Sequence, residues 1–95
     1  MYLGYQQVMA SIAVQTVAAL TIPARSTWVE LQATTNGVRY TMDGVTDPTT
    51  ATGMLLVNGS DPLFFQREDL ARIRFCRDGA ADGALNLHYG AGRDV

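Results

Sequence analysis

Leu20-Thr-Ile-Pro-Ala-Arg-Ser-Thr-Trp-Val-Glu-Leu-Gln-Ala33 is the stretch that decides the fold. An apolar run stops at Pro23, a polar turn follows, and residues 28–33 then alternate apolar and polar side chains. Proline has no N–H to give to a sheet, and alternation with a period of two is typical of a half-buried strand. The stretch therefore predicts a strand, a turn and a second strand, and similar patterns recur along the chain.

The recurrence predicts about seven short strands, most of them closed by turn-forming residues. They are Ala13–Leu20, Trp28–Ala33, Val38–Met42, Met54–Val57, Pro62–Gln66, Arg72–Arg77 and Ala84–Tyr89. Residues 8–20 are ambiguous because their alanines permit a helix, whereas the β-branched residues favour a strand. Spacing of this kind predicts an all-β fold, a small antiparallel β-sandwich that is either jelly-roll-like or Ig-like.

Local signals add finer expectations within that fold. Asn36-Gly37 accepts positive φ and predicts a hairpin that joins Trp28–Ala33 to Val38–Met42. Met54–Val57 is short and apolar, as expected for a strand covered on both faces. Residues 67–70 are expected to form a polar turn or one turn of helix.

The chain is predicted to have an N-terminal arm, residues 1–12, and a single β-sandwich domain, residues 13–95. The first residues show no clear period, so they fit a frayed tail or an arm that docks on a neighbouring molecule. Tyr2, Leu3 and Tyr5 are the side chains that such an arm would use.

Size and composition point to a partner. A chain of 95 residues makes one domain with a thin core, and its single cysteine, Cys76, allows no disulfide within the chain. Only 17% of the residues are charged, against a typical ~25%. Oligomerisation or docking on a larger surface is the remaining way to bury more area.

Charge and hydropathy exclude other classes of partner. The chain has seven basic and nine acidic residues and a net charge of −2, and this balance does not indicate binding to nucleic acid. All seven basic residues are arginine. The N-terminal region has no basic segment, and polar residues interrupt its apolar run, so we expect neither a signal peptide nor a membrane span. A lone cysteine fits assembly in a reducing cytoplasm.

No cluster of residues forms a recognisable catalytic or metal-binding motif, so we expect no enzyme, no small-molecule substrate, no cofactor and no metal. His88 has no evident partner for general-base work, and Asp43, Asp47 and Asp61 are turn residues without calcium-loop spacing. Cys76 shares a strand face with two arginines that could lower its pKa, although a passive small side chain is the preferred interpretation.

Arg72 and Arg74 form a basic stripe on one face of their predicted strand. Binding to a single nucleic-acid strand would need aromatic residues on that same face, and Phe75 falls on the other. The stripe is therefore expected to pair with acidic side chains of an adjacent strand or subunit.

Five segments in order resemble a family of small virion proteins of tailed bacteriophages. They are residues 18–28 (AALTIPARSTW), 38–44 (VRYTMDG), 47–54 (DPTTATGM), 69–75 (DLARIRF) and 84–89 (ALNLHY). The resemblance covers roughly residues 15 to 90. The sequence departs from the family pattern at Arg25, where a glycine is usual, which bears on the geometry of that turn.

The resemblance implies a capsid decoration (cement) protein on the virion surface, assembled in the host cytoplasm. Its partners would be the major capsid protein and further copies of itself, as a trimer around a threefold axis. Tyr2, Leu3 and Tyr5 would then touch the shell or a neighbouring copy, and Trp28 and Arg74 would lie near a subunit contact. The alternative within the virion is a tail, baseplate or fibre-associated β-module.

Overall fold

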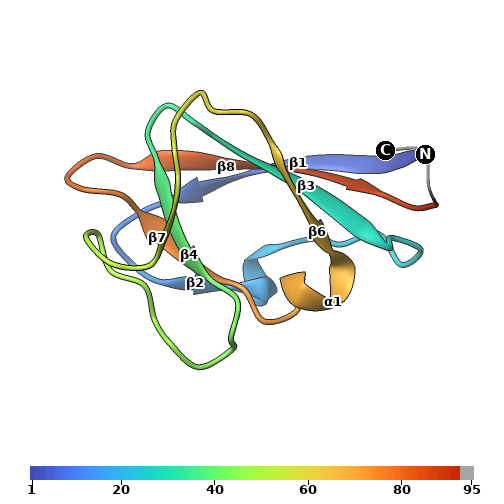
Figure 1. Ribbon diagram of the computed structural model, residues 1–95, viewed down its shortest axis with the longest axis horizontal. Helices are drawn as coiled ribbons and strands as arrows, with labels where there is room; N and C mark the ends of the chain where they lie inside the picture. Colours follow the sequence, from blue (N-terminus) through green and yellow to red (C-terminus); the bar gives the residue numbers. More distant parts are fainter. Residues whose placement is uncertain (93–95) are drawn as a thin grey trace.

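The computed structural model describes residues 1–92, which form eight strands and two short helical turns (Figure 1). The strands are β1 (Tyr2–Ala10), β2 (Gln15–Thr16), β3 (Trp28–Thr34), β4 (Val38–Thr41), β5 (Met54–Leu56), β6 (Leu63–Gln66), β7 (Arg74–Arg77) and β8 (Gly83–Gly90). The helical turns are η1 (Val17–Ala19), of 3₁₀ type, and α1 (Arg67–Leu70). Within residues 1–92, no helix has the length and apolar character needed to span a membrane.

The strands form two four-stranded antiparallel sheets, with the orders β1-β8-β3-β6 and β2-β7-β4-β5. β1 pairs with β8, β2 with β7, β3 with β6, and β4 with β5. The chain is thus one long antiparallel ribbon, wrapped so that β8 also pairs with β3 and β7 with β4. This is the strand order of a jelly roll, so the predicted β-sandwich is confirmed in its jelly-roll form.

Side chains from both sheets fill the space between them. In β3, β8 and β7 the inward positions follow the alternation of apolar and polar side chains along the sequence. The main buried residues are Val29, Leu31, Val38, Tyr40, Leu56, Leu70, Ile73, Phe75, Leu85, Leu87 and Tyr89. The Tyr89 hydroxyl donates to Gln6 Oε1 at 2.8 Å, and burial raises the pKa of Tyr89 to about 12.

The N-terminal segment is not an arm. Residues 2–10 form β1, a nine-residue strand that pairs along β8. Its inward positions include Gly4 and Gln6, which are not apolar side chains. The sequence therefore lacks the alternation of apolar and polar residues that would have indicated a strand. Gln6 is kept there by polar links, because its Oε1 accepts from Tyr89 and from the Thr21 N–H at 2.9 Å.

The predicted strand Ala13–Leu20 shrinks to two residues in β2. Thr16 ends it, because its Oγ1 accepts a hydrogen bond from the Ala18 N–H at 3.3 Å. A threonine side chain that captures nearby backbone competes with the sheet in this way. The next residues turn as η1, which closes with a bond from the Leu20 N–H to the Val17 carbonyl.

The predicted hairpin between Trp28–Ala33 and Val38–Met42 is wrong. Both strands exist, but β3 and β4 belong to different sheets, so the connection crosses the sandwich. Positive φ falls on Thr35, at 71°. The Asn36 amide instead donates to the carbonyls of Asp78 and Ala81, at 2.7 and 2.6 Å, and ties the crossing to the β7–β8 connection.

Two further expectations concern the strands after the 43–53 loop. β5 is not covered on both faces, since Leu56 is buried whereas Met54 and Leu55 are exposed. β6 is confirmed, and so is the helical turn that follows it as α1.

Candidate functional site

An unbroken row of five rings crosses the outer face of the β1-β8-β3-β6 sheet. We call it the aromatic row, and its members in order are Tyr5, His88, Tyr2, Trp28 and Phe64. Successive ring centroids lie 6.0, 3.8, 5.1 and 5.8 Å apart. The register explains the order, because Tyr5 is paired with His88, and both Tyr2 and Trp28 are paired with Gly90. The row therefore draws on all four strands of the sheet.

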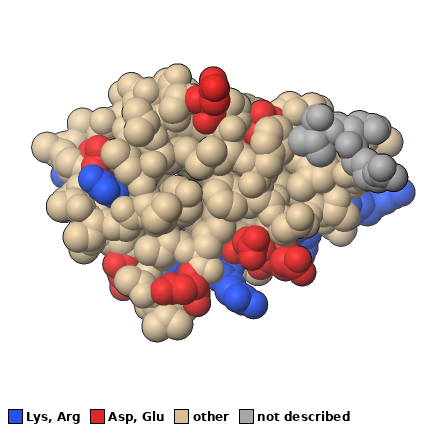
Figure 2. Space-filling view, in the orientation of Figure 1, with Lys and Arg blue, Asp and Glu red and all other residues tan. Residues whose placement is uncertain are grey.

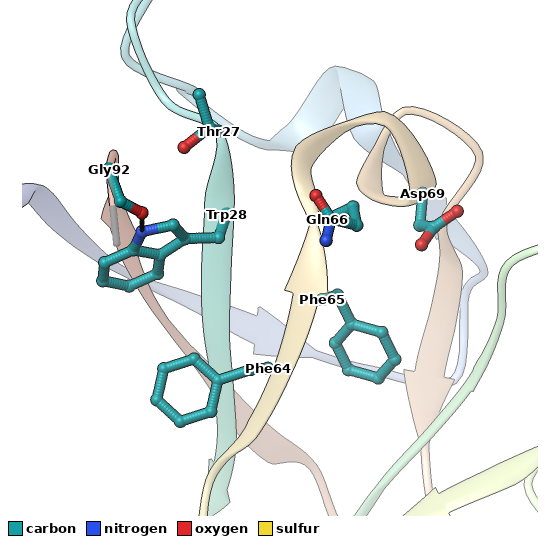
Figure 3. A pocket seen from close by; sticks show the side chains of 7 residues that line it. All are labelled: Thr27, Trp28, Phe64, Phe65, Gln66, Asp69 and Gly92. Carbon is teal, nitrogen blue, oxygen red and sulfur yellow. Dashed lines mark hydrogen bonds between the residues drawn. The ribbon is translucent and has the colours of Figure 1, made fainter. Parts of the chain in front are cut away.

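Trp28 is the buried member of the row and is anchored at both ends of its indole. The six-membered ring lies where a side chain at Gly90 would be, which is possible only because Gly90 has none. The indole Nε1 donates to the Gly92 carbonyl at 3.1 Å (Figure 3). Figure 3 also shows Phe64 and Phe65 leaving β6 on opposite sides, with Phe64 beside Trp28.

Polar side chains hold the two tyrosines of the row in place. The Tyr2 hydroxyl donates to Glu30 Oε1 at 3.1 Å, and this bond raises the pKa of Tyr2. The Tyr5 hydroxyl donates to Asn86 Oδ1 at 2.8 Å. His88 Nδ1 lies 3.9 Å from Glu30 Oε1, so the Glu30 carboxylate lies next to both the Tyr2 and the His88 rings.

Two hollows adjoin the row. One, of about 170 Å³, is lined by Glu30, Gln32, Pro62, Asn86 and His88. The other, of about 400 Å³, is drawn in Figure 3 and is lined by Thr27, Trp28, Phe64, Phe65, Gln66, Asp69 and Gly92. The first brings together carboxylate, amide and imidazole groups. The second combines three aromatic rings with three polar side chains and the backbone of Gly92.

The structure brings together three of the six interaction residues proposed from the sequence. Tyr2, Tyr5 and Trp28 belong to the aromatic row. Leu3 lies at an irregularity in the β1 pairing and lines a separate hollow with Met1 and Arg25 among others. Arg72 and Arg74 lie apart from the row, just before and at the start of β7 in the other sheet.

Arg74 is committed to a contact inside the molecule. Its Nη1 lies 2.6 Å from Asp47 Oδ1, and its Nη2 donates to the Gly44 carbonyl at 2.9 Å. The stem of Arg72 lies against Gly44 as well. Arg74 thus pairs with an acidic side chain, but Asp47 belongs to the loop after β4 and not to an adjacent strand or subunit as expected. The pair fixes that loop.

Asp43 builds a turn, as predicted. Its Oδ1 accepts from the N–H groups of Val45 and Thr46, at 3.0 and 2.9 Å, and its Oδ2 accepts from the Thr46 hydroxyl at 2.6 Å. These bonds lower the pKa of Asp43 to about 2. Within residues 1–92, no three His, Cys, Asp or Glu side chains are grouped so as to hold a metal ion.

The arginines do not lower the pKa of Cys76 below its ordinary value. Cys76 is buried in β7, and burial raises the pKa of its thiol more than the nearby Arg39 lowers it. A neutral buried thiol behaves as a small apolar side chain, which is the passive role that the sequence favoured.

Sequence reasoning missed the polar members of the site. The alternation places Glu30, Asn86 and His88 on outer faces, but only the register shows that they are neighbours of Tyr2 and Tyr5.

Comparison with known proteins adds no relative: no family model, no curated protein and no solved structure matches the chain.

Proposed function

We propose that this chain is a non-enzymatic structural protein of a tailed-phage virion, which decorates the capsid and adds contacts between major capsid protein subunits. The resemblance to small phage virion proteins suggested this role. The jelly-roll strand order supports it by analogy, because viral capsid domains share this architecture among others. The observation that supports this proposal most is that two opposite sides of the sandwich expose apolar side chains.

One of these sides is the β5–β6 margin, which we define as Met54, Leu55, Val57 and Leu63. β5 and β6 are the last strands in the order of their sheets and follow each other in the chain, so they lie on one side of the sandwich. All four side chains of this margin are exposed, and Met54 is 63% exposed. A side of this kind is suited to being covered by a partner.

The opposite side is the β1–β2 margin, which we define as Met9, Ile12 and Val14. β1 and β2 are the first strands of the two orders, and Ile12, in the connection between them, is 65% exposed. A contact between one margin of a copy and the other margin of the next is heterologous, and it closes into a ring if the rotation allows. A ring of three copies closed in this way would fit the threefold position that we propose on the capsid.

Charged side chains leave much of the surface free for such contacts. On the face seen in Figure 2 they are few over the middle and gather along the lower edge, near the 43–53 loop and α1. Several arginines are neutralised within the molecule, as in the pairs Arg39–Asp78 and Arg77–Asp82, both at 2.9 Å. The remaining exposed surface is weakly charged, which lowers the cost of desolvation at an interface.

Copy number in purified particles tests the role directly, by quantitative mass spectrometry together with cryo-electron microscopy. We expect many copies on the head lattice. A small ring or a tip would assign the chain to the tail, baseplate or fibre instead. Absence from particles would overturn both virion roles.

Charge substitutions in the margins test the assembly. Ile12→Asp or Val57→Arg should each reduce the oligomer to monomer in sedimentation velocity, because either one places a charge in the same heterologous contact. The double variant should recover the oligomer, since the two charges then meet each other. Val45→Asp is the control, because Val45 is exposed in the 43–53 loop and belongs to neither margin. An oligomer unaffected by either single substitution, Ile12→Asp or Val57→Arg, would contradict this arrangement.

A further inference from the structure

The aromatic row leaves unusually large ring surfaces in water. Tyr2 is 47%, Tyr5 62% and Phe64 48% exposed. Adjacent strands are roughly 4.8 Å apart, so a row over four strands extends for about 14 Å. Exposed apolar surface that is both continuous and extended marks a binding site more often than chance exposure does.

The smaller hollow supplies hydrogen-bonding groups next to these rings. Among the described residues, Glu30 Oε2, Gln32 Oε1 and His88 Nε2 have no hydrogen-bond partner, and all three residues line this hollow. Glu30 and Gln32 offer acceptors, and His88 can donate or accept. A ligand here must therefore carry donors at short spacing, and an acceptor beside them would also satisfy His88 when it donates.

The site is already ordered before any ligand arrives. Tyr2 and Tyr5 are held by Glu30 and Asn86, and Asn86 in turn accepts from Gln7 Nε2 at 2.9 Å and donates to Thr34 Oγ1 at 3.2 Å. Side chains that are fixed in advance lose little conformational entropy on binding. The arrangement suits a weakly binding, flexible ligand.

Charge decides between classes of ligand. The outward positions of β1, β8, β3 and β6 hold one acid, Glu30, and neither arginine nor lysine within residues 1–92. A nucleic acid or another polyanion could stack on the rings but would meet a carboxylate and no cation. A protein surface would bury Glu30 and His88 at a desolvation cost that its apolar side chains do not offset.

A sugar meets both requirements. The C–H face of a pyranose ring is apolar and weakly positive, so it packs on the negative face of an aromatic ring. Its hydroxyl groups both donate and accept, which satisfies a carboxylate, an amide and an imidazole together. We propose that the aromatic row and its adjoining hollow bind a neutral oligosaccharide built of hexopyranose units.

This site lies on a broad face of the sandwich, whereas the two margins lie on its sides. Sugar binding by the row is therefore independent of the decoration role, and the failure of one proposal leaves the other standing.

The test is an NMR titration of the ¹⁵N-labelled chain with three neutral hexasaccharides: cellohexaose, maltohexaose and hexa-N-acetylchitohexaose. We expect at least one of them to shift amide signals of β1, β3, β6 and β8 around the row, and to leave those of β4 and β7 unchanged. No shift with any of the three at millimolar concentration, or shifts centred elsewhere, would overturn the proposal.

Variants locate the contact. Tyr5→Ala and Phe64→Ala should each weaken binding about tenfold, as expected when one stacked ring is lost. Tyr5→Phe keeps the ring and should retain most of the affinity, and Val45→Ala is the control for an exposed residue elsewhere. Equal affinity of the wild type and both alanine variants would contradict a role for the row.

Two further measurements exclude other occupants. A twelve-residue thymidine oligonucleotide and a heparin hexasaccharide should leave the row signals unchanged, and tighter binding of either would overturn the neutral-sugar assignment. In particles, the row should remain in solvent. A row buried against the major capsid protein would identify it as a protein contact and refute the proposal.

Discussion

The indole of Trp28 occupies the space that a side chain at Gly90 would fill, and the two residues are paired across β3 and β8. Gly90 has no positive φ that would require glycine, so the requirement comes from contact alone. Because Trp28 links Tyr2 to Phe64, this one pair keeps the aromatic row continuous.

Gly90→Ala should therefore displace the indole. Overpacking of this kind costs about 1–3 kcal/mol in the free energy of unfolding, and tryptophan emission should move to longer wavelength as the ring enters water. Urea unfolding followed by fluorescence and circular dichroism measures both effects. In a Trp28→Ala background the same Gly90→Ala change should cost little, and an equal cost in both backgrounds would show that the two residues are not coupled.

Acid should loosen the turn after β4. The pKa of Asp43 is about 2 in the folded chain against an ordinary 3.8, because the bonds from Thr46 and Val45 favour the carboxylate. As the pH falls, the unfolded state takes up this proton first, so the contribution of Asp43 to stability is present above about pH 4 and is lost between about pH 4 and 2. The urea midpoint measured across this range should vary less in Asp43→Asn than in the wild type. Asp61→Asn is the control, and an identical pH profile for Asp43→Asn and the wild type would disprove the role of Asp43.

Loss of the Arg74–Asp47 pair should act locally. Both side chains are partly exposed, so Arg74→Leu should lower the free energy of unfolding by at most about 1 kcal/mol. Because the guanidinium also holds the Gly44 carbonyl, amide hydrogen exchange should accelerate in the 43–53 loop. Arg25→Leu is a matched control, since Arg25 is exposed and lies outside that loop. Unchanged exchange in the loop of Arg74→Leu would show that the pair does not fix it.

Cys76 should be unreactive in the folded protein. Its side chain is buried and burial raises the pKa of the thiol, so both access and the thiolate population are reduced. Reaction with a disulfide reagent at pH 8 should be slower by at least about tenfold in buffer than in denaturant. Comparable rates under the two conditions would mean that β7 opens readily.

The parts of the fold that the sequence predicted correctly are those where one face is apolar and the other is polar. β3 and β8 show this alternation, so their inward residues could be named in advance. The same reasoning failed for β1, whose inward positions include Gly4 and Gln6. Gln6 tolerates its inward position only because Tyr89 and Thr21 donate to it, and these partners are distant in the sequence.

Pairing between strands was the other limit of prediction. Asn36-Gly37 satisfied the local rule for a hairpin, yet the Asn36 amide is used to bind the carbonyls of Asp78 and Ala81. Alternation tells which face of a strand is buried, not which sheet the strand enters. For the same reason Tyr2, Tyr5 and Trp28 could be named singly, whereas the row that joins them with His88 and Phe64 depends on the register.

The pairing of β1 with β8 also sets the order in which this domain can mature on the ribosome. β1 is synthesised first, but its partner strand is the last of the eight to be made. Until residues 83–90 have left the exit tunnel, β1 has no edge to join, and its tyrosines remain on an unpaired chain. Such exposed strand edges favour association between nascent chains, so synthesis of this domain carries an aggregation risk that ends only when its final strand is complete.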